Sequence, residues 1–355
     1  GMIGASLSGV TFISVPGAVE SKQFGYMQVV MGYFFGYLAI AYVLLPLYYK
    51  LNLTSIYTYL RDRFGNVSYK TGAIAFLVSR TIGASFRLFL VANVLQLLVG
   101  EPLGISFPWM VVITIGLIWI YTFRGGIKTI VWTDTLQTLF MLISVVVTSY
   151  FLATSLGFES IGDVYHNVVE SNLSKTFFFD DKNDAQYFFK SFLSGMFITI
   201  TMTGLDQDMM QKNLTCRNLG EAKKNMISFS IVLVFVNLLF MVLGLLLTQY
   251  AIQNGIEARK DDLFPTIAML PEIGKVTSAF FLLGLIAAAY SSADSALTSL
   301  TTSFCIDILG FERKPEASQK RTRKITHVAF SVLLIGVIIF FKYLFKDVSI
   351  IWELF

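Results

Sequence analysis

A polar stretch inside an apolar segment is the first place in this chain where the residue types could do chemistry. The stretch AAAYSSADSALTSLTTS covers 287–303, within an apolar run that begins near Val276. On a helix at about 100° per residue, its small and hydroxyl side chains share one face. This face holds Ala288, Ser291, Ser292, Ser295, Thr298, Ser299 and Thr302, with Asp294 at its edge. Hard cations such as sodium bind oxygen ligands of this kind, so the face is a candidate sodium site; close packing of two helices is the alternative.

Two acidic residues lie within apolar segments that are predicted to be membrane helices. Asp294 belongs to the polar stretch, and Asp134 lies early in another apolar segment, in TIVWTDTLQTLFMLI. A carboxylate near the centre of a membrane helix costs about 2.5–3.5 kcal/mol on insertion scales, so it faces a cavity, an ion or an opposite charge. Both are therefore candidate cation ligands. A structural salt bridge to Arg80 or Arg87 is the alternative for each.

Two arginines lie in a third apolar segment, in SRTIGASFRLFL. Arg80 and Arg87 are seven residues apart and share one face of a predicted helix. Guanidinium groups inside a membrane need anionic partners, and the carboxylate of a bound solute is one such partner. We therefore treat Arg87 as a candidate binding residue for an anionic solute. Snorkelling to the membrane interface is the alternative for Arg80.

The elements that must position these residues are membrane-spanning helices. The 355 residues are 55% hydrophobic and only 14% charged, with a mean hydropathy of +0.67, whereas soluble domains carry about 25% charged residues. Apolar runs of roughly 20 residues, which span a membrane as helices, recur along the chain. We predict an all-α polytopic membrane protein with nine helices, over about 2–18, 24–49, 69–99, 107–123, 129–155, 187–209, 226–253, 276–306 and 325–345.

The basic residues predict the orientation of these helices. Most of the 27 Lys and Arg residues fall in alternate loops, and basic residues accumulate in cytoplasmic loops. The loops predicted to be cytoplasmic are 50–70, 124–128, 210–225 and 310–324. We expect a multi-pass protein embedded in the lipid bilayer of the plasma membrane, with a bacterial inner membrane favoured.

Two of the predicted helices contain an interruption. The first carries VPG at 15–17, and the sixth carries TMTGLDQD at 201–208. Such a pair is typical of an inverted-repeat transporter whose broken helices hold the binding site near the middle of the membrane; a simple kink is the alternative at each position. We predict a first repeat over 1–155, an extracellular or periplasmic loop over 156–186, and a second repeat over 187–355. Because the chain starts and stops within apolar sequence, we expect it to be truncated at both ends, with a tenth helix largely missing.

The sequence contains no GxxxxGK[ST], HExxH or GxSxG motif, and its only histidines are His166 and His327. Nucleotide hydrolysis and metal or nucleophilic catalysis depend on motifs of these kinds. We therefore expect neither an enzyme nor a nucleic-acid partner. The oligomeric state stays open.

Three motifs resemble those of the sodium:solute symporter family, which includes glucose, iodide, proline and sialic acid carriers. They are YTFRGGIKTIVWTDTLQ at 121–137, GLDQDMMQKNL at 204–214 and AAAYSSADSALTS at 287–299, and their order and spacing match across most of the chain. The resemblance implies a LeuT-type core of two inverted five-helix repeats. It also implies sodium-coupled uptake of a small organic solute by alternating access.

The resemblance assigns two groups of sodium ligands. The shared site of the family uses carbonyls of the first helix together with an alanine carbonyl and two hydroxyls of the eighth. These ligands match Gly9, Phe12, Ala288, Ser291 and Ser292. A second site of some members matches Asp134, Asp294 and Ser295. Whether one or two sodium ions (Na+) are coupled stays open.

The solute is less closely defined. The sugar carriers have an aromatic pair before the position of Gly204, whereas this chain has Met202 and Thr203, so a stacking platform for a sugar ring is missing. We predict a sugar acid such as sialic acid, or a monocarboxylate, with a sugar or amino acid carrier as the alternative. The resemblance places Thr199, Met202 and Thr203 in the solute cavity, with Arg87 as an added candidate. A solute sensor built on the transporter fold is the alternative from another class of protein.

Overall fold

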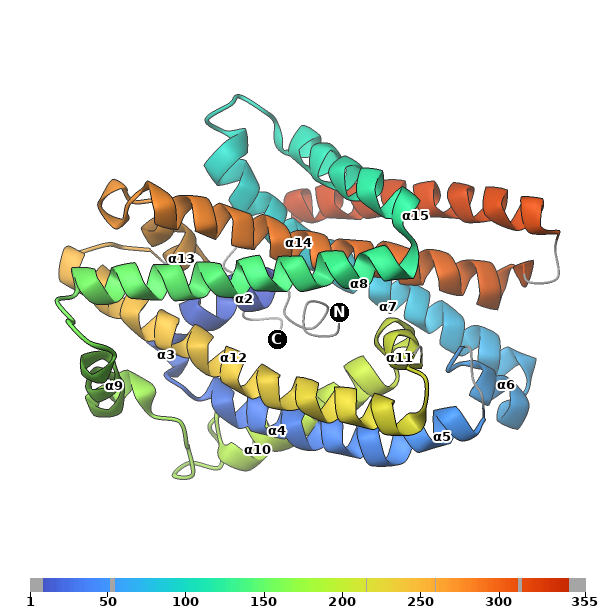
Figure 1. The fold of residues 1–355 in the computed structure, drawn as a ribbon, viewed down its shortest axis with the longest axis horizontal. Coiled ribbons are helices and arrows are strands. Elements are labelled where there is room, and N and C mark those ends of the chain that lie inside the picture. Colours follow the sequence, from blue (N-terminus) through green and yellow to red (C-terminus); the bar gives the residue numbers. More distant parts are fainter. Residues whose placement is uncertain (1–8, 52–54, 215, 259, 312–314, 345–355) are drawn as a thin grey trace.

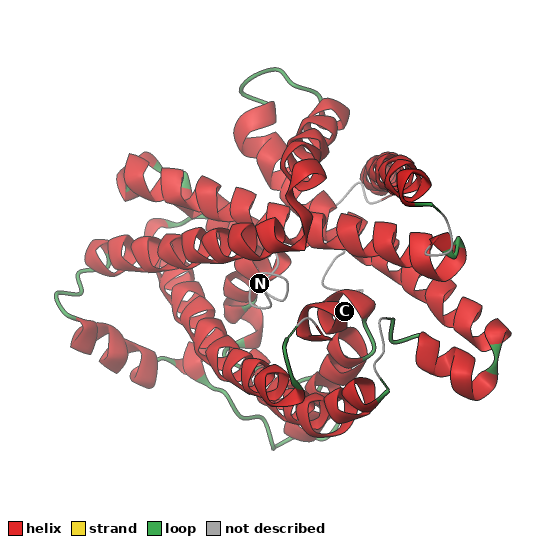
Figure 2. Ribbon diagram, turned by 45° about the vertical axis from the view of Figure 1, so that its right-hand side comes forward, coloured by secondary structure: helices red, strands yellow, loops and turns green. Residues whose placement is uncertain are grey.

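The structure is a computed structural model that describes residues 9–51, 55–214, 216–258, 260–311 and 315–344. Within these ranges every regular element is a helix, and Figure 2 shows helices joined by loops. The first half contains α2 (Gly9–Gly17), α3 (Val19–Lys22), α4 (Tyr26–Ala39), α5 (Leu45–Lys50), α6 (Thr58–Phe64), α7 (Asn66–Leu95) and α8 (Phe107–Ser155). The second half contains α9 (Ile161–Glu170), α10 (Phe188–Thr199), α11 (Gln207–Leu214), α12 (Leu219–Asn254), α13 (Lys260–Ala268), α14 (Lys275–Ser303) and α15 (Glu316–Leu344).

Single π-helical turns extend four of these helices. They are η1 (Ile40–Leu44), η2 (Gln96–Gly100), η4 (Ile200–Gly204) and η6 (Phe304–Ile308). Two 3-10 turns, η3 (Asn172–Ser174) and η5 (Pro271–Ile273), lie in the connections. A π-turn holds one residue more than a regular helical turn and is found often at functional sites.

The predicted segments reappear as helices with shifted boundaries: α12 begins at Leu219 and α15 at Glu316, both earlier than expected, and residues 2–8 of the first segment lie outside the described residues. The segments expected at 107–123 and 129–155 form a single helical element, α8, of 49 residues. Figure 1 shows this element turning back on itself, so that its teal and green halves run in different directions. By length and composition, five of the described helices could cross a membrane, and the bent pair of α10–η4 and α11 would be a sixth. Two further apolar pieces, Phe107–Ile120 and Lys275–Ala287, are shorter.

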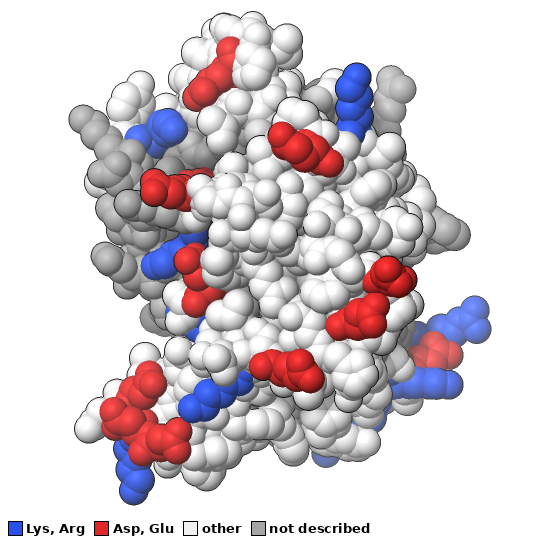
Figure 3. Space-filling view, turned by 90° about the vertical axis from the view of Figure 1, so that its left-hand side faces the viewer, with Lys and Arg blue, Asp and Glu red and all other residues white. Residues whose placement is uncertain are grey.

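The long helices run roughly along the long axis of the molecule and bring alternate loops to opposite ends (Figure 1). Elements α5, α6 and α11 lie at one end, and α9 lies at the other. Figure 3 faces the end that carries α9 and shows acidic side chains spread over it. The predicted separation of basic and acidic loops thus has a counterpart in the arrangement of the helices.

Helices α4 and α10 approach each other closely at two glycines. A Cβ atom on Gly32 would overlap the backbone of Phe192, and one on Gly195 would overlap the backbone of Val29. Small residues let two helix backbones come this close in a membrane. The two helices therefore form one tightly packed pair.

The two predicted interruptions take different forms. In the sixth predicted helix, α10–η4 and α11 meet at an angle of 69° across Leu205 and Asp206, which confirms the break expected at 201–208. In the first, α2 stays helical through Gly17 with Pro16 inside it, and α3 starts at Val19. Pro16 has no N–H to donate within the helix, and α2 ends one residue after it, at Gly17.

Candidate functional site

The break between η4 and α11 leaves backbone groups that need partners, as helix ends do. The Tyr48 hydroxyl donates to the Gly204 carbonyl at 2.8 Å, and the Tyr57 hydroxyl donates to the Leu205 carbonyl at 3.4 Å. On the other side of the break, the Met209 N–H donates to the Asp206 carboxylate at 3.0 Å. The break is therefore held by side chains of both halves of the chain.

A buried ion pair lies directly beside this break. Arg80 of α7 pairs with Asp208 of α11, and Arg80 Nη1 lies 3.8 Å from Asp206 Oδ2. The three side chains are only 13%, 6% and 14% exposed, in the order Arg80, Asp208 and Asp206. Removing one partner of a buried pair leaves an uncompensated charge and costs about 3–5 kcal/mol. The pair therefore fixes α7 against α11.

The same carboxylate continues the contacts into α14. The Ser295 hydroxyl donates to Asp208, lying 2.9 and 2.7 Å from its two oxygens. The Lys212 ammonium donates in turn to Ser295 Oγ at 2.8 Å. We call Arg80, Asp206, Asp208, Lys212 and Ser295 the central network. It joins α7, α11 and α14 with two cations and two carboxylates.

Helix α2 meets α14 through aromatic side chains. The ring of Phe12 stacks on Phe281 of α14 with centroids 5.7 Å apart, and lies 5.1 Å from Phe264 and 6.2 Å from Phe240. Phe12 is fully buried. Gly284 makes room for this contact, because a Cβ there would lie 3.1 Å from the Phe12 ring. The helix predicted to supply sodium-binding carbonyls thus packs on the helix predicted to supply hydroxyls.

The proline of α2 bears on one of these carbonyls. Pro16 has no N–H and is four residues after Phe12, so the Phe12 carbonyl lacks the donor that a regular helix would give it. A carbonyl without its helical donor can turn to another positive partner. This is a chemical reason for a cation ligand at Phe12, and it needs no unwinding of the helix.

The other predicted sodium ligands can be placed by element only. Gly9 begins α2, Asp134 lies in α8, and Ala288, Ser291 and Ser292 lie in α14, about two turns or more after Phe281. The side chains of these five residues are outside the described part of the structure. Asp294 and Ser295, also in α14, are buried. Ser295 belongs to the central network, and the sequence analysis did not predict its contacts with Asp208 and Lys212.

The predicted solute residues lie in three different surroundings. Thr199 and Thr203 are buried, and a Cβ on Gly36 of α4 would lie 2.8 Å from the Cβ of Thr199. Met202 is 53% exposed. Arg87 lies two turns beyond Arg80 on α7 and forms no ion pair with any described carboxylate. Of the two arginines, Arg80 is thus paired within the protein, whereas Arg87 is not.

Sequence reasoning missed Asp206, Asp208 and Lys212 as members of a site. All three lie in the motif GLDQDMMQKNL, which the sequence analysis used only for the family resemblance and, up to Asp208, for the helix interruption. The available signal was the pair of carboxylates beside a break, together with a buried arginine in need of partners. Arg80 pairs with Asp206 and Asp208, two partners that the sequence analysis did not consider; a salt bridge from Asp134 or Asp294 to Arg80 or Arg87 stays an untested alternative.

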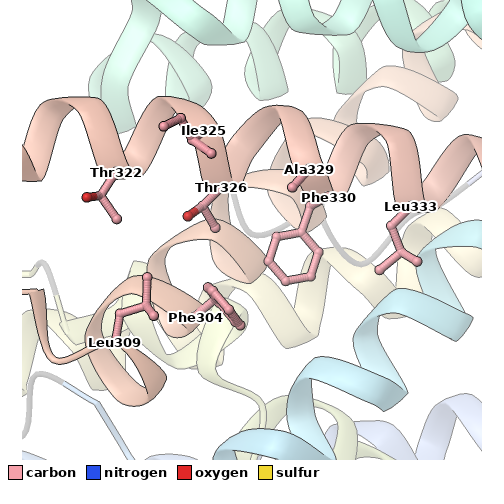
Figure 4. A pocket seen from close by; sticks show the side chains of 8 residues that line it. All are labelled: Phe304, Leu309, Thr322, Ile325, Thr326, Ala329, Phe330 and Leu333. Atoms are coloured by element: carbon pink, nitrogen blue, oxygen red, sulfur yellow. The ribbon is translucent and has the colours of Figure 1, made fainter.

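One pocket lies away from these residues. It has a volume of about 390 Å³ between the end of α14 and α15 (Figure 4). Its lining is mainly apolar and consists of Phe304, Leu309, Thr322, Ile325, Thr326, Ala329, Phe330 and Leu333. None of these residues is a candidate for sodium or solute binding, so the pocket does not bear on the site.

Comparison with known proteins gives a family match over nearly the whole chain. Residues 1–354 match the model of the sodium:solute symporter family. The sodium/sialic acid symporter NanT of Aliivibrio fischeri is 27% identical, with 99% of this chain and 69% of the relative aligned. The sodium/sialic acid symporter SiaT of Proteus mirabilis is 24% identical, covering 98% of this chain and 68% of the relative.

A second kind of relative matches a shorter part of the chain. The sodium-dependent multivitamin transporter of Oryctolagus cuniculus is 29% identical over 59% of this chain. The chain spans about a third of that relative, since the match covers 32% of its length.

A solved structure shows the same fold. A Na+-coupled sialic acid symporter in a substrate-bound, outward-open state matches with a TM-score of 0.83 at 21% identity, covering 96% of this chain and 72% of the other. The expected all-helical symporter fold is confirmed by this match. The broken sixth helix, the polar face of α14 and the family match over residues 1–354 agree. The chain belongs to the sodium:solute symporter family.

Proposed function

We propose that this chain is the core of a carrier that uses sodium to import a small solute with a carboxylate group, with a sugar acid such as sialic acid as the first candidate. Arg87 carries the proposal for the carboxylate, because it is a cation in a predicted membrane helix and forms no ion pair with a described carboxylate. A guanidinium binds a carboxylate through two parallel hydrogen bonds. The names of two relatives, both sodium/sialic acid symporters, support the same class of solute.

The sodium site that we propose lies between α2 and α14. Its ligands would be the carbonyls of Gly9, Phe12 and Ala288 and the hydroxyls of Ser291 and Ser292. The packing of Phe12 on Phe281 and the missing N–H of Pro16 support this position. Sodium binding would favour the state in which α2 and α14 are held together, since a ligand shifts an equilibrium only through its different affinity for the two states.

The driving force that one sodium ion supplies depends on the charge of the solute. Moving one charge down a potential of 100 mV releases about 2.3 kcal/mol, and a tenfold sodium gradient adds about 1.4 kcal/mol. The sum of about 3.7 kcal/mol sustains a roughly 500-fold gradient of a neutral solute. An anionic solute would offset the charge of one sodium ion and leave only the chemical gradient, so it gains more from a second ion.

We also propose the membrane arrangement. The chain would form two inverted repeats, over 1–155 and 187–355, in the plasma membrane. The segments 50–70, 124–128, 210–225 and 310–324 would face the cytoplasm, because basic residues accumulate on that side; residues 124–128, predicted to be a loop, lie within α8. Labelling a single cysteine introduced at exposed Lys224 from either side of sealed vesicles tests the orientation. Labelling from the outside of right-side-out vesicles would contradict it.

The function is tested by uptake into proteoliposomes. Labelled sialic acid, a monocarboxylate, a neutral sugar and an amino acid are each offered with and without an inward sodium gradient. We expect sodium-driven uptake of a carboxylate solute, lost in Ser292→Ala and in Arg87→Gln but kept in Arg61→Gln, whose ion pair with Asp62 is exposed.

Two other outcomes would contradict parts of the proposal. Competition by neutral solutes alone would exclude the role of Arg87 in carboxylate binding. Saturable binding of a solute without sodium-driven uptake would replace the carrier by a membrane sensor.

A further inference from the structure

The Ser295 hydroxyl has partners both for its proton and for its oxygen. It has one proton, which it donates to the Asp208 carboxylate at 2.7 and 2.9 Å from the two oxygens. Its oxygen accepts from the Lys212 ammonium at 2.8 Å. The side chain of Ser295 is 2% exposed, so water does not compete freely for these contacts.

The cation on this hydroxyl comes from the protein itself. Lys212 belongs to α11, the short helix after the 69° break, and the break directs it toward α14. An ammonium and a sodium ion both seek the lone pairs of a hydroxyl oxygen, and each carries one positive charge. They therefore compete for the same face of Ser295.

The charges of the central network are already balanced. Arg80 and Lys212 supply two positive charges, and Asp206 and Asp208 supply two negative charges. A sodium ion on Ser295 Oγ would add a third positive charge next to the Lys212 ammonium, in a buried place where screening by salt is weak. Without Lys212, Ser295 and the Asp208 carboxylate would lose the positive charge that contacts the hydroxyl and would attract another cation more strongly.

We propose that the Lys212 ammonium is a tethered cation that occupies the place of a second sodium ion at Ser295, so that the unmodified protein binds a single sodium ion. This inference rests on the proposed sodium-coupled function and makes it more specific, because it fixes the number of ions. Lys212 acts here as a residue that determines ion stoichiometry, and Asp208 positions Ser295 for it.

The test counts sodium ions bound to the purified protein, without any solute. Binding of radioactive ²²Na+ is measured as a function of concentration for the unmodified protein, Lys212→Met, Lys212→Arg and Lys224→Met. Lys212→Met keeps the length of the side chain without its charge, and Lys212→Arg keeps the charge. Lys224→Met is the matched control, since Lys224 is exposed at the start of α12.

We expect about one ion per molecule for the unmodified protein, Lys212→Arg and Lys224→Met, and about two for Lys212→Met. Two ions on the unmodified protein would overturn the inference, and this measurement does not depend on any variant folding. One ion on a folded Lys212→Met would also overturn it, because the ammonium would then exclude nothing. No sodium binding by the unmodified protein would instead overturn the proposed sodium-coupled function, and the inference with it.

Discussion

The helix interruptions at α2 and at α10–α11 are held by opposite kinds of contact. Around Pro16 and Phe12 the neighbours are aromatic rings, with Phe12 packed on Phe240, Phe264 and Phe281. Around Asp206 the neighbours are tyrosine hydroxyls and Arg80. The three rings packed on Phe12 offer no N–H or O–H donor, whereas the tyrosines and Arg80 beside the second interruption are hydrogen-bond donors.

The difference indicates how much freedom each interruption leaves for a ligand. Ring contacts are not directional and do not compete for a carbonyl, so the Phe12 carbonyl keeps its capacity to bind a cation. The carbonyls of Gly204 and Leu205 are already hydrogen-bonded by Tyr48 and Tyr57. We infer that the interruption in α2 is suited to reversible ion binding. The break at Leu205 and Asp206, before α11, is instead a fixed bend, which we call the corner.

The largest loss of stability is expected when the buried ion pair beside the break before α11 is removed. Arg80→Leu leaves Asp206 and Asp208 buried without their cation, at a cost of about 3–5 kcal/mol. We expect little folded protein by fluorescence-detected size-exclusion chromatography. Arg61→Leu is the control, because its ion pair with Asp62 is exposed and worth at most about 1 kcal/mol. A normal yield and Tm for Arg80→Leu would show that the pair does not hold the corner.

A second variant places an extra methyl group against α2 at Pro16. A Cβ on Gly244 of α12 would overlap the carbonyl oxygen of Pro16 and touch Val19. Gly244→Ala should therefore destabilise the protein by about 1–3 kcal/mol, the usual cost of overpacking, and lower the Tm measured by differential scanning fluorimetry. Gly336→Ala in α15 is the control, since a Cβ there meets nothing within 4 Å. Equal Tm values for the two variants would mean that α2 can move away from the added methyl group at little cost in stability.

A third variant separates ion binding from stability at the same interruption. Pro16→Ala restores the N–H that can donate to the Phe12 carbonyl. We expect sodium affinity to fall about tenfold, equivalent to about 1.4 kcal/mol, with the Tm unchanged or raised. The measurement is the sodium concentration that gives half-maximal thermal stabilisation, with Pro108→Ala at the start of α8 as the control. Unchanged sodium affinity would remove the Phe12 carbonyl from the site.

The smallest effect is expected from one hydrogen bond at the corner. Tyr48→Phe removes the donor to the Gly204 carbonyl and should cost about 1 kcal/mol, seen as a small fall in Tm with sodium affinity unchanged. Tyr42→Phe provides the comparison, since Tyr42 is 60% exposed. A change in sodium affinity for Tyr48→Phe would show that the corner takes part in ion binding after all.

The sequence predicted the parts of this protein that depend on local pattern. Hydropathy located the apolar helices, and the polar run at 201–208 located the break, because both signals lie within one segment. The partners of Arg80 could not be found in this way. Asp208 is 128 residues away, and only the folded arrangement of α7 and α11 brings it to Arg80.

The polar stretch of α14 shows the same limit within a single helix. Its small and hydroxyl residues were placed on one face by periodicity, which does not tell a bound ion from a neighbouring side chain. Ser295 was assigned to a second sodium by resemblance, whereas the structure places the ammonium of Lys212 against it. The sequence pattern of α14 suggests that an ion supplies the positive charge beside Ser295. A lysine from another helix can supply it instead.

The number of residues in the π-turn η4 determines how α11 is oriented. Its five residues, Ile200–Gly204, precede the corner, and Gly204 lies against Ile40 and Leu44 of η1, a second π-turn. Removing one residue from a helix rotates everything beyond it by about 100° and shortens it by about 1.5 Å. A one-residue deletion in η4 would thus turn α11, with Asp208 and Lys212, away from Arg80 and Ser295 while leaving every residue of the motif GLDQDMMQKNL in place. When relatives are aligned, a single-residue gap here changes the geometry more than many substitutions would.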